Sequence, residues 1–334
     1  MGYDLGLGGP VRILSGVQPS GSLHLGNYLG AIRQFLALQD RPENECYFFV
    51  ADLHAMTTIH DGKALRSLAL QVATDYLALG LDPARAVIYR QSDLPQVTEL
   101  AWMLSTVTPM GLLQRGHSYK DKLARGIAPT HGLFAYPVLM AADVLIVRAD
   151  RVPVGRDQKQ HLEMTRDIAL AFNSAHGEEI LRLPEAVILP DAAVVPGVDG
   201  QKMSKSYGNA IKLFAPESEL RKAVMSIVTD STPLESPKPT RGSTLYSLLK
   251  LLTPDEEWPD TRTLFSEGGH GYGEMKTRLL GRILDRFRPA RQRHEELLQD
   301  PGLVESVLRS GADRARGVAA HVMAECRRVC GLAG

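Results

Sequence analysis

Short apolar runs alternate with longer segments of helical periodicity through the first 200 residues of the chain. The runs have the length and the β-branched and aromatic content of buried strands, and they cover residues 11–14, 46–51, 86–90, 152–155 and 187–189. Between the runs, the spacing of apolar residues predicts helices over residues 27–39, 63–79, 96–106, 134–147 and 156–173. This alternation predicts an α/β fold, with a doubly wound parallel sheet covered on both faces and ligands at the carboxyl ends of the strands.

Beyond residue 200 the pattern becomes helical throughout, and no predicted strand interrupts it. The expected helices cover residues 219–228, 243–252, 276–287, 290–298, 302–308 and 312–330. We therefore predict a sheet domain over residues 1–200 and an all-helical domain over residues 201–311. The last helix, residues 312–330, is left free to pack back onto the sheet domain.

Composition is that of a globular protein without a strong overall field. The 334 residues are 44% hydrophobic and 23% charged, and 38 basic residues balance 38 acidic ones. A polyanionic partner would therefore have to bind a local basic patch. The three cysteines (Cys46, Cys326, Cys330) form neither a disulfide framework nor a metal-binding motif, which favours a reducing cytoplasm and no metal site. The sequence also offers no secretory signal and no segment of membrane-spanning length.

A turn rich in glycine, proline and serine joins the first predicted strand to the first helix, over residues 18–27. Such a turn directs free backbone N–H groups and the positive end of the helix dipole at an anion. His24 and Asn27 would stand at this helix start as neutral hydrogen-bond donors. The turn lacks both familiar glycine-rich phosphate motifs. The alternative interpretation is an ordinary turn with one surface histidine.

A second motif, Lys202-Met203-Ser204-Lys205-Ser206, lies among glycines and is expected on a mobile loop that carries two ammonium groups. By chance this pentapeptide would occur in on the order of one chain in ten thousand. A chain that combines it with His24-Leu25-Gly26-Asn27 resembles the class I aminoacyl-tRNA synthetases. In that family the first motif holds ATP and the second closes over its phosphates.

An isolated carboxylate also calls for an explanation. Asp143 lies in the apolar segment 134–147, where a buried charge is costly unless it finds donors. The alternative is an aspartate on an exposed stripe or one that caps a neighbouring helix. Pro137 is expected in the first turn of this helix, where proline is tolerated. His54, at the end of a predicted strand, is either a residue of the pocket wall or a core histidine with satisfied hydrogen bonds.

Within the class, most of the chain is similar to the bacterial tryptophanyl-tRNA synthetases. The resemblance is carried by residues 15–31, 136–145, 152–168 and 202–206, and by a Gly-Tyr-Gly turn at 271–273. It implies a Rossmann-like catalytic domain that binds ATP and tryptophan, and a helical domain that contains the 202–206 loop and the region that binds the tRNA anticodon. The implied reaction forms tryptophanyl-adenylate and pyrophosphate, and then transfers tryptophan to the terminal adenosine of tRNA(Trp).

The resemblance also implies the roles of individual residues. In the tryptophan site, Asp143 would accept a hydrogen bond from the indole N–H, and the remaining contacts would come from Tyr136, Met140, Gln158, Gln18 and His54. The ATP site would comprise Gln18, Pro19, Ser20, His24, Gly26, Asn27, Gly155, Arg156, Asp157, Val194, Lys202, Met203, Ser204, Lys205 and Ser206. Of these, Asp157 would contact the ribose and Val194 the adenine. The residues that act on the phosphates or position the reactants would be Lys202, Lys205, Lys122, Asn27 and Gln18.

Partners and cofactors follow from the same resemblance: ATP with Mg²⁺, L-tryptophan, tRNA(Trp) and a second copy of the chain as a homodimer. Seven basic residues lie between 275 and 293, and four of them are candidates for RNA contact: Lys276, Arg278, Arg282 and Arg286. A solvated helix face explains the same run equally well. The chain departs from the usual pattern at Leu14, Leu53, Arg156 and residues 114–130.

Three rival functions stay open at this point. They are a tyrosine-specific synthetase of the same class, a nucleotidyltransferase that does not use tRNA, and a tryptophan-binding paralogue with a regulatory or partner-binding role.

Overall fold

A five-stranded parallel sheet forms the centre of the protein, as the sequence predicts. The computed structural model describes residues 11–116, 130–155, 158–188 and 195–332. The sheet has the order β3-β2-β1-β4-β5, in which every described pair of neighbours is parallel. The chain proceeds outward from β1 to β3 and then returns to β4 on the other side of β1, so the topological switch point lies between β1 and β4. The strands are β1 Val11–Val17, β2 Asn44–Val50, β3 Ala86–Arg90, β4 Arg151–Val154 and β5 Glu185–Ile188.

The two faces of the sheet bury separate sets of side chains, because successive residues of a strand point to opposite sides. Ile13 and Phe48 belong to one hydrophobic cluster, while their neighbours Leu14 and Phe49 belong to the other. The first cluster packs against α2 (Arg33–Gln39) and α4 (Gly62–Ala78). The second packs against α5 (Gln96–Ser105), α8 (His131–Ile146) and α9 (Lys159–His176).

Short elements follow the carboxyl ends of the first three strands. The helix predicted from residue 27 begins earlier, as α1 (Leu25–Asn27), and passes through one π-helical segment, η1 (Tyr28–Ile32), before α2. The chain turns through α3 (Asp52–Ala55) after β2 and through η2 (Gln91–Asp93) after β3. A further short helix, α6 (Met110–Gln114), follows α5.

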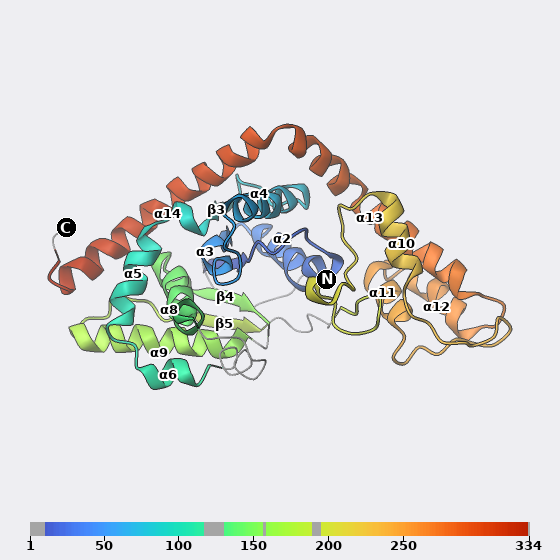
Figure 1. Ribbon diagram of the computed structural model, residues 1–334, viewed down its shortest axis with the longest axis horizontal. Helices are drawn as coiled ribbons and strands as arrows, with labels where there is room; N and C mark the ends of the chain where they lie inside the picture. The colour runs from blue at the N-terminus through green and yellow to red at the C-terminus, as the bar shows by residue number, and fades with distance from the viewer. Residues whose placement is uncertain (1–10, 117–129, 156–157, 189–194, 333–334) are drawn as a thin grey trace.

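The C-terminal part is helical, and its two long helices form an arch over the sheet region (Figure 1). They are α13 (Tyr272–Gln299) and α14 (Pro301–Val329), preceded by η4 (Lys205–Tyr207), α10 (Glu217–Met225), α11 (Thr244–Leu252) and α12 (Trp258–Ser266). The sequence did not predict α12. None of the described helices is both long enough and apolar enough to cross a bilayer.

Two predicted helix breaks are wrong, because the helices of the arch are continuous at both places. Helices expected at 276–287 and 290–298 are one helix that runs through Pro289, and those expected at 302–308 and 312–330 are also one helix. Gly311 does not end α14, because it lies where the helix crosses β3. A Cβ at this position would be 2.6 Å from the carbonyl carbon of Ile88. The glycine therefore serves close packing of helix on strand.

A third correction concerns Pro137. The helix that contains it begins at His131, where the Thr130 hydroxyl accepts a hydrogen bond from the Leu133 N–H (3.2 Å). Pro137 is therefore buried inside α8 and not in its first turn. The sequence signal for the helix start was the N-cap threonine, which precedes the apolar run by four residues.

Helix α14 packs along β3 and also contacts α4, α5 and α8. Buried residues of α11 and α13 belong to the same cluster as one face of the sheet. The hydrophobic core is thus continuous from the sheet into the helical part. The domain boundary near residue 200 stays a prediction.

Candidate active site

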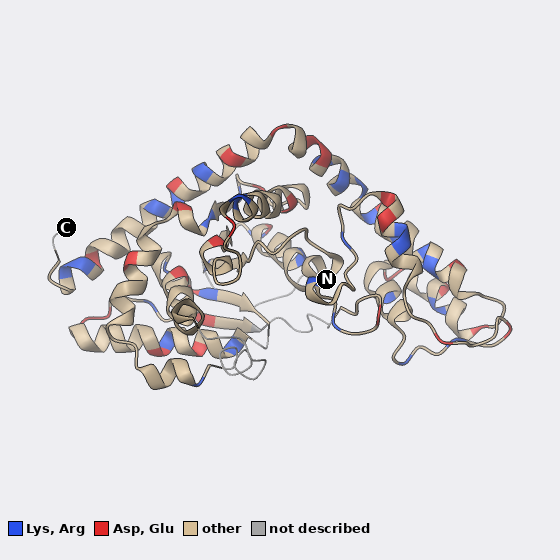
Figure 2. Ribbon diagram, viewed as in Figure 1, with Lys and Arg blue, Asp and Glu red and all other residues tan. Residues whose placement is uncertain are grey.

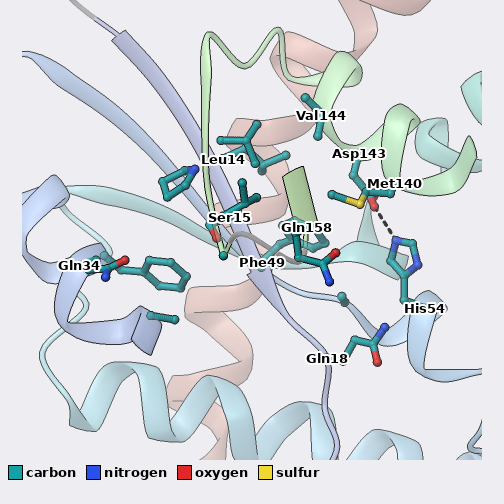
Figure 3. Close-up of a pocket in the computed structure, with 18 of the residues that line it drawn as sticks. Leu14, Ser15, Gln18, Gln34, Phe49, His54, Met140, Asp143, Val144 and Gln158 are labelled. Atoms are coloured by element: carbon teal, nitrogen blue, oxygen red, sulfur yellow. Dashed lines mark hydrogen bonds and ion pairs between the residues drawn. The ribbon is translucent and has the colours of Figure 1, made fainter. Parts of the chain in front are cut away.

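A cavity of about 480 Å³ opens at the switch point between β1 and β4. Leu14 and Ser15 of β1 line it (Figure 3), as do Val152 and Val154 of β4. The structure brings together at this cavity all six residues predicted for the tryptophan site, namely Gln18, His54, Tyr136, Met140, Asp143 and Gln158. Gln18 was also predicted for ATP, as was Gly155, which lines the same cavity.

Asp143 projects from α8 into the cavity wall and is 2% exposed, so an exposed stripe or a helix cap does not explain it. Its Oδ2 lies 2.9 Å from Nε2 of His54, and the amide Nε2 of Gln91 lies 2.8 and 2.9 Å from its two oxygens. Burial raises the pKa of Asp143, while the hydrogen bonds from His54 and Gln91 act in the opposite direction. The carboxylate is thus supplied with donors inside an otherwise largely apolar wall.

His54 satisfies both interpretations left open by the sequence. It lines the cavity, and its ring is buried and hydrogen-bonded to Asp143. Since a carboxylate only accepts, the imidazole carries a proton on Nε2. Its ring faces that of Tyr136 edge-on, with the centroids 6.3 Å apart. The Tyr136 hydroxyl in turn lies 2.5 Å from Nε2 of His161. Polar groups therefore converge on one side of the cavity.

The turn over residues 18–27 forms a capping box at the start of α1. The Asn27 N–H donates to Nδ1 of His24 (3.3 Å), and the His24 N–H donates to Oδ1 of Asn27 (3.1 Å). His24 therefore accepts through Nδ1, a refinement of its predicted role as a donor, and Nε2 carries the proton. Burial and, second, the charge of Lys205 lower the pKa of His24 to about 4, so the ring is neutral at physiological pH.

Gly26 permits the close approach of the two signature motifs, His24–Asn27 and Lys202–Ser206. Its N–H lies 3.3 Å from the sulfur of Met203, which belongs to the Lys202–Ser206 motif. A Cβ on Gly26 would lie 3.0 Å from two atoms of the His24 ring. The same Cβ would lie 3.3 Å from Cβ of Met203, so a larger residue would crowd the contact between the turn and the motif.

Lys205 closes the same contact from the other side. Its Nζ donates to the Gly21 carbonyl oxygen (2.6 Å) and lies 3.4 Å from the Ser20 hydroxyl. Burial lowers the pKa of Lys205, and the charge of Asp75 opposes that effect. Lys202, by contrast, is exposed. Together these contacts place an ammonium group beside the start of α1, an arrangement suited to phosphate.

Two residues that the sequence analysis missed hold this region. Asn209, 2% exposed, accepts from the Ser204 N–H (2.8 Å) and donates to the Lys202 carbonyl (3.2 Å). Asp75, buried in α4, accepts from the Leu23 N–H (3.0 Å). Polar residues inside amphipathic or loop segments gave no sequence signal beyond their type.

The remaining residues predicted to bind ATP or act on its phosphates divide into those that the structure describes and those outside the described part of the chain. Pro19 is buried within the turn, whereas Ser206 is exposed and lies 2.8 Å from the Ser204 hydroxyl. Four predicted residues lie outside the described part of the chain: Lys122, Arg156, Asp157 and Val194.

Three of the four predicted RNA-contact residues of α13 contact other parts of the protein. Lys276 donates to the Met225 carbonyl (3.0 Å), and Arg282 pairs with Glu257. Arg286 lies over the Tyr28 ring, 5.7 Å from its centroid, and Arg278 is half-buried. Figure 2 shows basic and acidic segments interspersed along the arch. These contacts indicate that the basic residues of α13 contribute to the fold. Neither RNA contact nor a solvated helix face, the two interpretations of the sequence, included such a role.

No group of three or more His, Cys, Asp or Glu side chains within the described ranges could hold a metal ion. Four polar groups beside the helix start are neutral or basic: Asn27, Ser20, neutral His24 and Lys205. The one carboxylate described near them, Asp75, is fully buried. The four groups suit an anion. A magnesium ion here would have to arrive on the phosphates of a nucleotide.

Comparison with known proteins gives a consistent family. Residues 7–259 match the family model described as class I tRNA synthetases (W and Y). The tryptophan–tRNA ligase of Fusobacterium nucleatum is 50% identical over 97% of this chain and 98% of its own length, and that of Rhodopirellula baltica is 49% identical over 96% and 100%. A crystal structure of tryptophanyl-tRNA synthetase from Campylobacter jejuni, complexed with ADP and tryptophan, matches with a TM-score of 0.90 at 46% identity, covering 96% of this chain and all of that one.

Proposed function

The chain belongs to the class I tRNA synthetases for tryptophan and tyrosine, and from this premise we propose that it joins L-tryptophan to tRNA(Trp). The buried carboxylate of Asp143 in the wall of the switch-point cavity carries the choice of tryptophan. An indole N–H is the donor that such an acceptor in an apolar pocket selects, since tyrosine and phenylalanine carry none at that place. The C. jejuni relative, which binds ADP and tryptophan, supports both substrates.

The remaining residues have roles in amino-acid binding. Met140 would lie against the indole ring, and Gln18, Tyr136 and Gln158 would hold the α-amino and carboxylate groups. All four line the same cavity as Asp143. His54 would set the direction of the Asp143 carboxylate through its hydrogen bond.

ATP would bind where the two signature motifs meet. Gly26 and Asn27 would contact the nucleotide at the helix start, as would Gly155 at the end of β4. Lys205 and Lys202 would bind the phosphates together with Mg²⁺. Lys122, Asp157 and Val194 keep the phosphate, ribose and adenine roles predicted for them, and Arg156 its place in the ATP site.

The tryptophan carboxylate is itself a nucleophile, so activation needs no general base. It attacks the α-phosphorus in line, and pyrophosphate leaves to give tryptophanyl-adenylate. The protein contributes placement and charge neutralisation. The adenylate then transfers tryptophan to the 2′-hydroxyl of the terminal adenosine of tRNA.

Other assignments are less direct. RNA contact by Lys276, Arg278, Arg282 and Arg286 requires that the tRNA compete with the intramolecular partners of at least three of them. A homodimer and a cytoplasmic location complete the proposal.

Amino-acid-dependent ATP–pyrophosphate exchange, run in parallel with tryptophan and tyrosine, tests the substrate. We expect exchange with tryptophan only, and Asp143→Ala should lower kcat/KM for tryptophan at least about 100-fold because the N–H loses its charged acceptor. Asp40→Ala, which removes an exposed carboxylate paired with Arg85, serves as the matched control and should retain activity. Exchange that survives unchanged in Asp143→Ala would contradict the proposal, and charging of tRNA(Trp) would exclude the rival without tRNA.

A further inference from the structure

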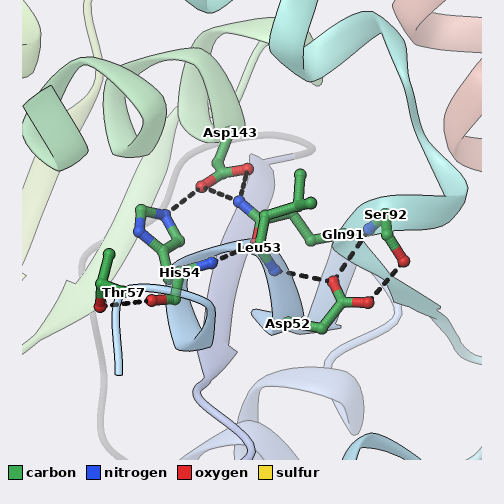
Figure 4. A network of polar contacts seen from close by, with 7 residues as sticks. All are labelled: Asp52, Leu53, His54, Thr57, Gln91, Ser92 and Asp143. Atoms are coloured by element: carbon green, nitrogen blue, oxygen red, sulfur yellow. Dashed lines mark hydrogen bonds and ion pairs between the residues drawn. The ribbon is translucent and has the colours of Figure 1, made fainter. Parts of the chain in front are cut away.

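The loops that follow β2 and β3 are tied to each other by two reciprocal sets of hydrogen bonds (Figure 4). From the β3 side, Oε1 of Gln91 accepts from the backbone N–H groups of Leu53 (3.1 Å) and His54 (3.3 Å). From the β2 side, Oδ1 of Asp52 accepts from the Ser92 N–H (3.0 Å), and the Ser92 hydroxyl donates to Oδ2. Each loop thus satisfies backbone donors of the other.

These ties fix the orientation of the Gln91 amide. Backbone N–H groups can only donate, so the amide oxygen must face Leu53 and His54. Nε2 must then face Asp143, where it lies 2.8 Å from Oδ1 and 2.9 Å from Oδ2. Gln91 is fully buried, and it is absent from the described lining of the cavity, which Asp143 and His54 share.

The hydrogen bonds leave one acceptor position on the carboxylate. A carboxylate has about four lone-pair positions, two on each oxygen. Oδ2 uses two of them, for His54 and Gln91, while Oδ1 uses one, for Gln91. Oδ1 can therefore accept one further hydrogen bond.

We propose that Gln91 is a positioning residue for amino-acid specificity: it holds Asp143 so that Oδ1 accepts the N–H of the bound indole. The inference rests on the proposed function, in which Asp143 recognises that N–H. Gln91 also links the two donors of the carboxylate, because the same amide that bonds Asp143 fixes the backbone of His54. Loss of the Gln91 donor should therefore weaken indole recognition without altering the ATP site.

The ionisation of Asp143 supports the same role for Gln91. Burial raises the pKa of Asp143, and the bonds from His54 and Gln91 counteract this. The titratable groups around the amide and the carboxylate are His54 from α3, Asp52 from the β2 loop and Tyr89 from β3. The oxygens of Asp52 accept hydrogen bonds from Leu53 and Ser92, so this side chain is bonded to the loops and not to Asp143.

The test compares tryptophan with benzothienylalanine, an analogue in which sulfur replaces the indole N–H. The measurement is the ratio of their kcat/KM values in ATP–pyrophosphate exchange. In Gln91→Met we expect the preference for tryptophan to fall about tenfold or more, while KM for ATP and the activity with the analogue change little. Ser92→Ala is the matched control, because it loosens the same pair of loops without touching the donor to Asp143, and it should keep the ratio.

Gln91→Glu separates the two functions of the side chain. Glutamate can still accept from Leu53 and His54, so the loops stay tied, but once it is ionised its carboxylate offers no donor to Asp143. Its preference for tryptophan should be lost at high pH, where both neighbouring carboxylates are ionised, and should recover as the pH falls, because a protonated glutamic acid can donate. This variant also decides the question if Gln91→Met does not fold.

The outcomes are distinct. Equal losses with both substrates in Gln91→Met, or a pH-independent ratio in Gln91→Glu, would overturn the positioning role and leave a purely structural one. A wild-type enzyme that uses tryptophan and the analogue equally well would instead refute the Asp143 contact on which the inference rests.

Discussion

Replacing Gly311 with alanine should force α14 away from the edge of the sheet. Gly311 is buried at the crossing of α14 with β3. A Cβ there would lie 2.6 Å from the carbonyl carbon and 3.0 Å from the amide nitrogen of Ile88, and nearer still to the carbonyl oxygen. These are backbone atoms of a strand bonded within the sheet, so the helix has to move.

The magnitude follows from the size of that movement. Ordinary carbon contacts begin near 3.4 Å, so the axis of α14 must shift by about 1 Å, which forfeits a quarter to a half of the dispersion energy at each affected contact. Val304, Leu308 and Ala315 on this helix are fully buried and would lose such contacts. Overpacking of this kind costs about 3 kcal/mol, and the better helix propensity of alanine offsets about 1 kcal/mol. We expect a net loss of about 2 kcal/mol.

The same helix provides the control. Gly317 is exposed, and a Cβ there would meet no atom within 4 Å, so Gly317→Ala should stabilise the protein by about 0.5–1 kcal/mol. Urea unfolding at one fixed protein concentration measures both variants. The free energies of unfolding should differ by about 3 kcal/mol between them. Equal stabilities would refute the close packing of α14 on β3.

Three further predictions concern the nucleotide side of the site. Lys205→Ala should slow adenylate formation in single-turnover experiments far more than it weakens tryptophan binding in equilibrium dialysis, and equal losses would mean that the loop does not act on the transition state. His24 has a pKa of about 4 in the folded protein against an ordinary 6.5, so the unfolded chain binds more protons between these values and stability should fall as the pH drops through this window. His24→Asn keeps a capping acceptor but does not titrate, so its free energy of unfolding should fall by less than that of the wild type between pH 6.5 and 4. Identical pH profiles of the two proteins would argue against a neutral, buried ring. Arg291 donates to two carbonyls of the 213–215 segment, beside the turn that we propose binds ATP, so Arg291→Ala should raise KM for ATP several-fold. Arg293→Ala is the control, because Arg293 pairs only with the exposed Glu296, and it should leave KM for ATP unchanged. Equal effects of the two substitutions would contradict this role of Arg291.

Sequence alone determined the parts of this protein that depend on local pattern. The apolar runs predicted the five strands to within a few residues, and their alternation with helices predicted the parallel sheet. The two signature motifs and the isolated Asp143 directed attention to the residues that line the cavity or meet beside it. These features could be predicted because periodicity, turn chemistry and an unusual charge are visible within a few neighbouring residues.

Only the tertiary structure decided what the long-range contacts do. Gly311 and Pro289 indicated helix ends, yet α13 and α14 continue through them, since packing on β3 requires the glycine and contacts on both sides of Pro289 hold the helix. Gln91 showed nothing in the sequence beyond a polar residue after a strand. Its partners are 37 to 52 positions away, and only the formation of the sheet brings the ends of β2 and β3 and helix α8 together around one carboxylate.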